Sequence, residues 1–159
     1  MDFQIRRAEQ KDAPHISKII RSLGYFSQIE SDPLEVTLER VENHLKMCIE
    51  NDSHSIYVAE DSKGKIVGYG SIHWLPYLIL NGPEGYLSEL FVDEASRGHG
   101  IGSQILEVIK AEARSRGCAR LMLLNLQKRE SYQRRFYSKN GWEEREGVAN
   151  FIYQLTGRI

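Results

Sequence analysis

Apolar and polar residues alternate in several short stretches of the chain, a pattern typical of strands that bury one face. A turn-forming cluster at residues 61–64 separates two of these stretches and predicts a hairpin between them. We expect strands at residues 3–7, 55–60, 65–74, 86–92 and 120–124, followed by a terminal hairpin of 142–145 with 150–155.

Other stretches repeat apolar residues every three or four positions, which is typical of helices with one buried face. Pro14 stands in the first turn of one such stretch, and Gly24, Gly117 and Gly141 end three of them. We expect helices at roughly 13–23, 34–50, 103–116 and 131–140, with a polar connector at 27–33. The order of these elements predicts an α/β (α+β) fold in which a mixed sheet carries helices on both sides.

The composition is that of an ordinary globular chain, and it excludes several classes of function. At 159 residues and 18.3 kDa the chain has the size of one domain, so we expect a single domain over residues 1–159. A net charge of −1 gives no electrostatic reason for nucleic acid binding, and no window has the length and apolarity of a membrane span. The two cysteines form no CxxC pair, so we expect no metal site and a reducing compartment, the cytoplasm.

The segment at residues 86–92 differs between its two predicted faces. Regular strand alternation places Leu87, Glu89 and Phe91 on one face of the sheet. The same alternation places Tyr86, Ser88, Leu90 and Val92 on the other.

The stretch Arg97-Gly98-His99-Gly100-Ile101-Gly102 carries the strongest chemical signal in the sequence, five residues past a predicted strand and at the start of a predicted helix. A turn this rich in glycine lets backbone N–H groups point inward, and the free amides of a helix start add positive potential. We therefore expect these amides, together with Arg97, to bind a pyrophosphate.

Three kinds of phosphate-binding turn compete for this stretch. A P-loop requires a lysine before its Ser or Thr, and Gly102-Ser103-Gln104 has none. A Rossmann turn requires a glycine at position 103 and a strand that ends at the first glycine, and the sequence has neither. The arrangement Arg-x-x-Gly-x-Gly after Leu90-Phe91-Val92 instead resembles the coenzyme A turn of the GNAT family of N-acetyltransferases.

A second segment extends this resemblance. The run from Arg135 to Trp142 is similar to the Phe-Tyr-x-Lys-x-Gly-Phe segment of the GNAT family, and the two motifs occur in the family's order. The likeness in element order covers nearly the whole chain, and the likeness in motifs covers residues 86–142. It implies the GNAT acyl-CoA N-acyltransferase fold, with a largely antiparallel central sheet flanked by helices.

The resemblance also implies a site and a co-substrate. The co-substrate is acetyl-coenzyme A, without a metal, and a homodimer is a candidate assembly. The pantetheine arm of acetyl-coenzyme A would pair with the backbone of Leu90 and Val92, and Tyr137 would stand near its sulfur as general acid. Where the family often has an asparagine contacting the cofactor, this chain has Glu130. The implied cofactor-binding set is Leu90, Phe91, Val92, Arg97, Gly98, His99, Gly100, Ile101, Gly102, Ser103 and Glu130.

The chemistry of acyl transfer assigns further roles. An alkylamine with a pKa of about 10.4 is protonated at neutral pH and must lose a proton before it attacks. Glu89 is the first candidate for the base, acting directly or through a water, with Glu84 and His73 behind it. The Leu90 N–H would stabilise the oxyanion, and Tyr137 would protonate the leaving thiolate.

The acceptor is an amine of a small molecule or peptide, and its identity stays open at this stage. The segment at residues 86–92 resembles the matching strand of the diamine acetyltransferases, in which two adjacent acids attract polyamines, although Ser88 replaces one of that pair. Two other readings remain: a module that binds coenzyme A without turnover, and a binder of nucleotide phosphates.

Overall fold

The computed structural model describes residues 2–155 as two compact units, one ending at Leu124 and the other beginning at Asn125. The single-domain prediction stays a prediction. The first unit holds β1 (Phe3–Arg7), α1 (Ala13–Arg21), α2 (Ser27–Ser31), α3 (Leu34–Asn51), β2 (His54–Asp61), β3 (Ile66–Leu75), β4 (Glu84–Val92), α4 (Ile101–Ser115) and β5 (Arg120–Leu123), with 3₁₀ turns at Gln10–Asp12 and Glu94–Ser96. The second holds α5 (Glu130–Gln133) and α6 (Phe136–Lys139).

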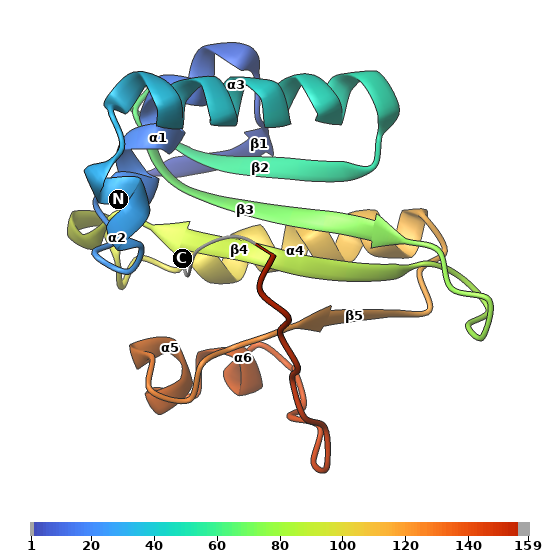
Figure 1. Cartoon of the computed structure of the whole chain (residues 1–159). Helices are drawn as coiled ribbons and strands as arrows, with labels where there is room; N and C mark the ends of the chain where they lie inside the picture. The colour runs from blue at the N-terminus through green and yellow to red at the C-terminus, as the bar shows by residue number, and fades with distance from the viewer. Residues whose placement is uncertain (1, 156–159) are drawn as a thin grey trace. The chain divides into compact units, whose positions relative to one another are not determined.

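The first unit is built on a five-stranded sheet in the order β1-β2-β3-β4-β5 (Figure 1). The first four strands pair antiparallel, and β5 pairs parallel to β4. This confirms the predicted mixed, largely antiparallel sheet. Strand β4 and helix α4 each begin two residues earlier than the sequence pattern predicts, at Glu84 and Ile101.

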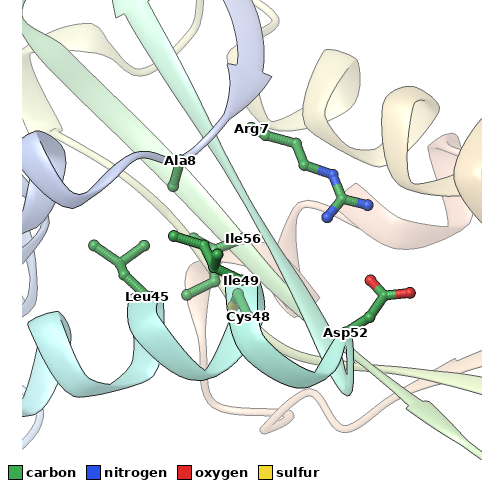
Figure 2. A pocket seen from close by; sticks show the side chains of 7 residues that line it. All are labelled: Arg7, Ala8, Leu45, Cys48, Ile49, Asp52 and Ile56. Carbon is green, nitrogen blue, oxygen red and sulfur yellow. The ribbon is translucent and has the colours of Figure 1, made fainter.

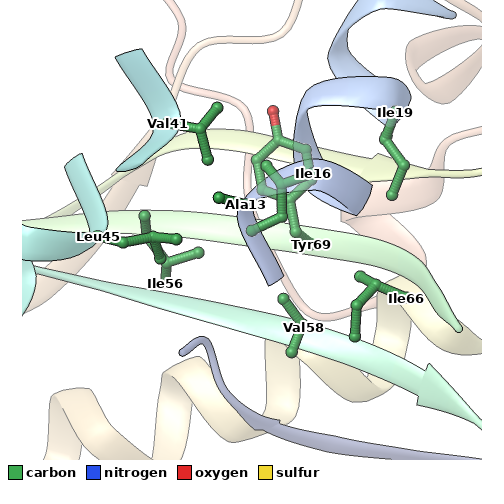
Figure 3. Packing of buried hydrophobic residues seen from close by; sticks show 9 residues of the cluster. All are labelled: Ala13, Ile16, Ile19, Val41, Leu45, Ile56, Val58, Ile66 and Tyr69. Atoms are coloured by element: carbon green, nitrogen blue, oxygen red, sulfur yellow. The ribbon is translucent and has the colours of Figure 1, made fainter. Parts of the chain in front are cut away.

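Helices α1 and α3 cover one face of the sheet and form the main hydrophobic core (Figure 3). Each side chain that meets in this core is less than a tenth exposed, and burial of each isoleucine, valine or leucine among them stabilises the fold by about 1.5–3 kcal/mol. The core comprises Ala13, Ile16 and Ile19 of α1, Val41 and Leu45 of α3, and Ile56, Val58, Ile66 and Tyr69 of the sheet.

Helix α4 covers the opposite face, so the predicted arrangement of helices on both sides is confirmed. Two glycines of β3 lie under this helix and allow it to approach closely. A Cβ atom added at Gly70 would lie 2.8 Å from Ile105 Cγ2, and one added at Gly68 would lie 3.3 Å from Ile101 Cγ2. Larger residues at these positions would push α4 off the sheet.

Helix α2 lies where the sequence predicts a polar connector. Its single turn is tied to α1 by the guanidinium of Arg21, which donates to the carbonyl oxygens of Ile29 and Asp32 at 2.7 Å each. Helices this short form only when tertiary contacts support them. Periodicity therefore carries no signal for this element.

The second unit breaks the helix that the sequence predicts at residues 131–140. Helix α5 ends at Gln133, and α6 begins at Phe136. Between them Arg135 adopts a left-handed conformation with a φ of 56°, which ends the hydrogen-bonding pattern of the first helix. The prediction of one continuous helix is therefore wrong.

The predicted terminal hairpin of 142–145 with 150–155 is also wrong. Residues 142–155 contain no strand in the described part of the chain. The side chains of Phe151 and Tyr153 are 90% and 87% exposed, so the alternating pattern that suggested a strand buries no face. Alternation predicts a strand only when a partner strand or a core is available to the apolar positions.

Candidate active site

A β-bulge in β4 sets the geometry of the candidate site. Ser71 of β3 is the register partner of Glu89, whereas the next residue, Ile72, pairs with Leu87. Ser88 is therefore the extra residue of the bulge, and it resets the alternation of the strand. The prediction that Ser88 and Glu89 lie on opposite faces is wrong for this reason.

Side-chain contacts place both residues on the face covered by α1 and α3. The Tyr69 hydroxyl, at the edge of the core on that face, donates to Glu89 Oε2 at 2.6 Å. His73 lies four residues further along the same face of β3, and its Nε2 is 3.1 Å from Ser88 Oγ. Leu87 is turned to the α4 face instead, with its partner Ile72. The bulge thus brings a carboxylate and a hydroxyl together on one side.

The second feature of the site is an open strand edge. Strand β5 pairs with β4 only from Glu84 to Leu87, so in the described unit the four residues Glu89 to Val92 pair with β3 alone. The Asp93 N–H donates to the Val67 carbonyl at 2.8 Å. Because backbone directions alternate in an antiparallel pair, the N–H and C=O groups of Leu90 and Val92 point away from β3.

Arg97 joins this edge to the glycine turn that follows it. Its Nε donates to the Val92 carbonyl at 3.3 Å, which agrees with a Val92 carbonyl that points outward. Gly98 and Gly100 both have a φ of 81°, and a Cβ atom added at either would meet nothing within 4 Å. The glycines are therefore required by the backbone conformation, and the space in front of them is open.

Helix α4 starts with free amides at the end of this turn. Gly100 occupies the N-cap position, and no side chain among residues 2–155 caps the helix. The first helical bond runs from the Gln104 N–H to the Gly100 carbonyl at 3.0 Å, so the three amides of residues 101–103 have no acceptor within the helix. Such a helix start attracts anions. In such an anion site Ser103 would contribute its backbone amide.

Three other predicted cofactor residues direct their side chains elsewhere. The Phe91 ring packs against Tyr69 at 5.8 Å between centroids, and its backbone faces β3. Ile101 is 1% exposed and belongs to the α4 core, so only its amide faces the turn. His99 is exposed, with its Nδ1 3.2 Å from the Ser96 carbonyl oxygen. Their contacts with a cofactor stay predictions.

Two of the three candidate bases, Glu84 and Glu89, lie in different environments. Glu84 is 1% exposed and ion-paired with Arg120 at the end of β4 where β5 is paired, so it is not placed to receive a proton from a substrate. Glu89 is exposed and held by Tyr69. Burial, and then the charge and hydrogen bond of Glu89, raise the pKa of Tyr69 well above its ordinary value. Tyr69 is therefore a neutral donor that orients the carboxylate.

Tyr69 has a role in the site that the sequence pattern does not reveal. Its hydroxyl reaches Glu89 only because of the register between β3 and β4, including the bulge. No local motif marks that register. The alternation of β3 predicts only that Tyr69 is buried.

The second unit carries the two remaining predicted residues. Tyr137 lies in α6, between the rings of Phe136 at 5.0 Å and Trp142 at 6.1 Å. Burial raises the pKa of its hydroxyl to about 12, opposed by the positive charge of Arg134, so the group is protonated at neutral pH. Glu130 is exposed in the first turn of α5. The roles predicted for both residues remain predictions.

A cavity of about 300 Å³ lies between β1, β2 and α3, apart from these residues (Figure 2). Leu45, Ile49 and Ile56 form its apolar part, and the charged groups of Arg7 and Asp52 lie at its other end. Burial raises the pKa of the nearby Cys48 thiol to about 11, so this thiol is not a nucleophile at neutral pH. No residue of the predicted site lines this cavity.

Comparisons with known proteins agree on one family. The chain matches the model of the Acetyltransferase (GNAT) family over residues 22–142. It is similar to the thialysine N-epsilon-acetyltransferase of Mus musculus, with 28% identity over 160 residues, which cover 95% of this chain and 92% of that protein.

Solved structures give the same fold. A transcriptional regulator from Bacillus halodurans C-125 superposes with a TM-score of 0.80 and 23% identity, covering 95% of this chain and 100% of that one. The glucosamine-6-phosphate N-acetyltransferase from Arabidopsis thaliana superposes with a TM-score of 0.76 and 23% identity, covering 97% and 100%. At this identity the likeness shows the fold alone.

Proposed function

Because this chain belongs to the Acetyltransferase (GNAT) family and is an acyltransferase, we propose that it transfers the acetyl group of acetyl-coenzyme A to the primary amine of a small molecule or peptide. One observation carries the proposal. The free edge of β4 at Leu90 and Val92 continues, through Arg97, into the uncapped amides at the start of α4.

These groups suit the chemistry of coenzyme A. The outward C=O group of Leu90 and N–H group of Val92 can pair with the amides of the pantetheine arm as an added strand would, which leaves the Leu90 N–H for the thioester carbonyl. The amides at residues 101–103 and the guanidinium of Arg97 can hold the pyrophosphate, because charge-assisted hydrogen bonds to several donors act together. The open space in front of Gly98 and Gly100 leaves room for the phosphate oxygens.

The amine side of the reaction falls to Glu89. An ammonium ion with a pKa of about 10.4 is attracted by a carboxylate and must pass it a proton, directly or through a water. The Tyr69 hydroxyl fixes the carboxylate at 2.6 Å and leaves the second oxygen for the substrate. The neutral nitrogen then attacks the acetyl carbon.

The thioester side falls to Leu90 and Tyr137. The outward Leu90 N–H would stabilise the negative charge that develops on the carbonyl oxygen. After the C–N bond has formed, the C–S bond breaks, and the Tyr137 hydroxyl would donate a proton to the leaving thiolate. The second proton of the nitrogen would then return to Tyr137. A coenzyme A thiol has a pKa of about 8.5 when it resembles a free cysteine, so this acid needs to supply only modest help.

The acceptor that we propose is a small amine rather than a nucleic acid or a lipid. The name of the mouse relative describes acetylation of the terminal nitrogen of thialysine, and the name of the Arabidopsis protein describes acetylation of an amino sugar phosphate. A single exposed carboxylate at Glu89 suits one ammonium group, whereas a polyamine would be better served by two. A location in the cytoplasm and a homodimer are part of the proposal.

A thiol-release assay tests the proposal. The protein is incubated with acetyl-coenzyme A and single members of an amine panel: a lysine analogue, an amino sugar phosphate, a polyamine and a peptide with a free N-terminus. We expect free thiol to appear with at least one of these. Calorimetric binding of coenzyme A, with dinucleotides as competitors, runs beside it. Tight coenzyme A binding without thiol release from any amine would instead support a non-catalytic module.

A further inference from the structure

Three histidines from three elements gather on the α1/α3 face of the sheet, and the charge of Glu89 acts on one of them, His73. His54 of β2 and His73 of β3 are register partners whose rings stack at 5.1 Å between centroids, with 14° between their planes. His44 of α3 contacts the His54 ring edge-on at 5.8 Å. Among residues 2–155 no group of three or more His, Cys, Asp or Glu side chains is arranged to hold a metal ion. The histidine cluster is therefore considered for a role other than metal binding.

A hydrogen-bond chain fixes the tautomer of His73. The Ser88 hydroxyl donates to the Ser71 carbonyl oxygen at 3.2 Å. Because a hydroxyl has one hydrogen, Ser88 Oγ can only accept in its 3.1 Å contact with His73 Nε2. The Nε2 atom therefore carries the proton of the neutral ring, and Nδ1 is the atom that is free to accept another.

The neighbouring groups keep this ring neutral at rest. Burial lowers the pKa of His73, Glu89 opposes this shift, and His44 adds to it. Burial, His73 and His44 lower the pKa of His54, which is 2% exposed and whose Nε2 has no hydrogen-bond partner among the described residues. Tyr86, the register partner of His73 on β4, completes the surroundings. Two stacked rings cannot both carry a charge at low cost.

We propose that His73, oriented by Ser88, is a proton-relay residue of the acceptor site, a role that rests on the function proposed above. Glu89 takes a proton from the substrate ammonium, and the neutral nitrogen forms its bond to the acetyl carbon before the C–S bond breaks. The proton then passes from the Glu89 carboxylic acid to His73 Nδ1, directly or through one water, and leaves to solvent. The second proton of the nitrogen replaces the one that Tyr137 gives to the thiolate. Each turnover thus forms one amide and one thiol and releases one proton, with no change of oxidation state.

The direction of this transfer follows from ordinary acid strengths. The proton moves from the carboxylic acid to the ring because imidazole is ordinarily the stronger base and because the carboxylate that remains at Glu89 raises the pKa of His73 against the effect of burial. Burial of the ring disfavours a long-lived charge on His73. The relay therefore returns Glu89 to its basic form and releases the proton quickly.

A His73→Ala variant with chemical rescue tests the relay. We expect kcat to fall about 100-fold, with the KM for the amine and the affinity for coenzyme A unchanged. Added imidazole should restore most of the lost rate, because it replaces the missing proton acceptor. The wild-type kcat should fall as the pH drops through the lowered pKa of His73, below about pH 6.5, and the variant should lose this acid limb.

Two further variants keep the test decisive. Ser88→Ala changes an exposed residue and removes the tautomer lock, so we expect kcat to fall several-fold, at the low end of what a positioned proton acceptor supplies. His15→Gln, on α1, is the matched control and should leave kcat and its pH profile unchanged. Thermal unfolding of each variant checks that it is folded. If His73→Ala does not fold, the pH profile of Ser88→Ala decides.

The outcomes separate this inference from the proposed function. A wild-type protein that releases no thiol with any amine would overturn the proposed function and the relay with it. An active wild type, combined with a His73→Ala variant that keeps its kcat and acid limb or that imidazole fails to rescue, would overturn the relay alone.

Discussion

The two halves of β4 are built from one continuous strand but have opposite surroundings. From Glu84 to Leu87 the strand pairs on both sides, with β3 and with β5. From the bulge at Ser88 onward it pairs with β3 alone. Each half carries one glutamate: Glu84 is 1% exposed and ion-paired, and Glu89 is exposed and hydrogen-bonded to a buried tyrosine.

Within the nine residues of β4, the half that is paired on both sides stabilises the sheet, and the half that is paired on one side is available for the proposed chemistry. In a strand that is paired on both sides, the backbone N–H and C=O groups are already hydrogen-bonded within the sheet. A buried carboxylate there must be neutralised by a partner. A strand paired on one side keeps free N–H and C=O groups that a ligand can use. The bulge marks the change from one condition to the other and turns Glu89 toward the α1/α3 face.

Replacing Glu89 should have the largest effect of the changes that test this comparison. Glu89→Gln keeps the shape and the hydrogen bond from Tyr69 but cannot accept a proton. We expect kcat to fall by about 10²–10⁴, with the free energy of unfolding unchanged. Steady-state kinetics with the best amine and thermal unfolding measure the two quantities. A variant that keeps wild-type turnover would remove Glu89 from the mechanism.

Tyr137→Phe tests the thioester side of the same reaction. The buried hydroxyl has a pKa of about 12 and is protonated throughout the neutral range. Because the leaving thiolate needs only modest help, we expect kcat to fall by about 10²-fold, the low end for a positioned acid, with coenzyme A affinity unchanged. Calorimetry and steady-state kinetics measure these values. Unchanged kcat would dismiss the acid role.

A pair of glycine variants tests the open half of the strand and its turn. Gly100 and Gly64 have left-handed φ values of 81° and 77°, so a leucine at either meets similar backbone strain. We expect Gly100→Leu to weaken coenzyme A binding about 10-fold to 100-fold, through the loss of about 1.4–2.8 kcal/mol. Gly64→Leu, in the β2–β3 turn, should bind normally. Equal affinities in the two variants would argue against a phosphate site at the turn.

The smallest effect on activity is expected in the closed half. Glu84→Gln removes a buried charge and leaves Arg120 without its ionic partner. We expect a loss of about 1–3 kcal/mol in the free energy of unfolding and no change in kcat. Chemical denaturation followed by kinetics on the folded protein checks both. A large loss of kcat with full stability would show that the two glutamates have been assigned in reverse.

Much of the frame of the site could be predicted from the sequence because its signals are local. The glycines at 98 and 100 indicate a special backbone conformation, and both have positive φ values. The apolar periodicity from Ile105 onward predicts the helix, which the structure begins at Ile101. These features depend on residues within one turn or one helix, so the sequence pattern is sufficient to find them.

The decisive details of the site depend on pairing between distant segments. Nothing near Ser88 signals a bulge, since it arises from how β4 fits against β3. The end of β5 pairing at Leu87 and the contact between Tyr69 and Glu89 have the same origin. Similarly, Arg135 breaks a predicted helix by adopting a conformation that arginine rarely takes. Such features follow from tertiary structure and not from propensity.

Backbone hydrogen exchange with and without coenzyme A tests the central claim most directly. The amides of Leu90 and Val92 point away from β3, so in the free protein we expect them to exchange faster than amides in the doubly paired half of β4. Adding coenzyme A should protect both amides, together with those at residues 101–103, and leave Gly85 to Leu87 unchanged. Coenzyme A binding that leaves Leu90 and Val92 unprotected would contradict the account.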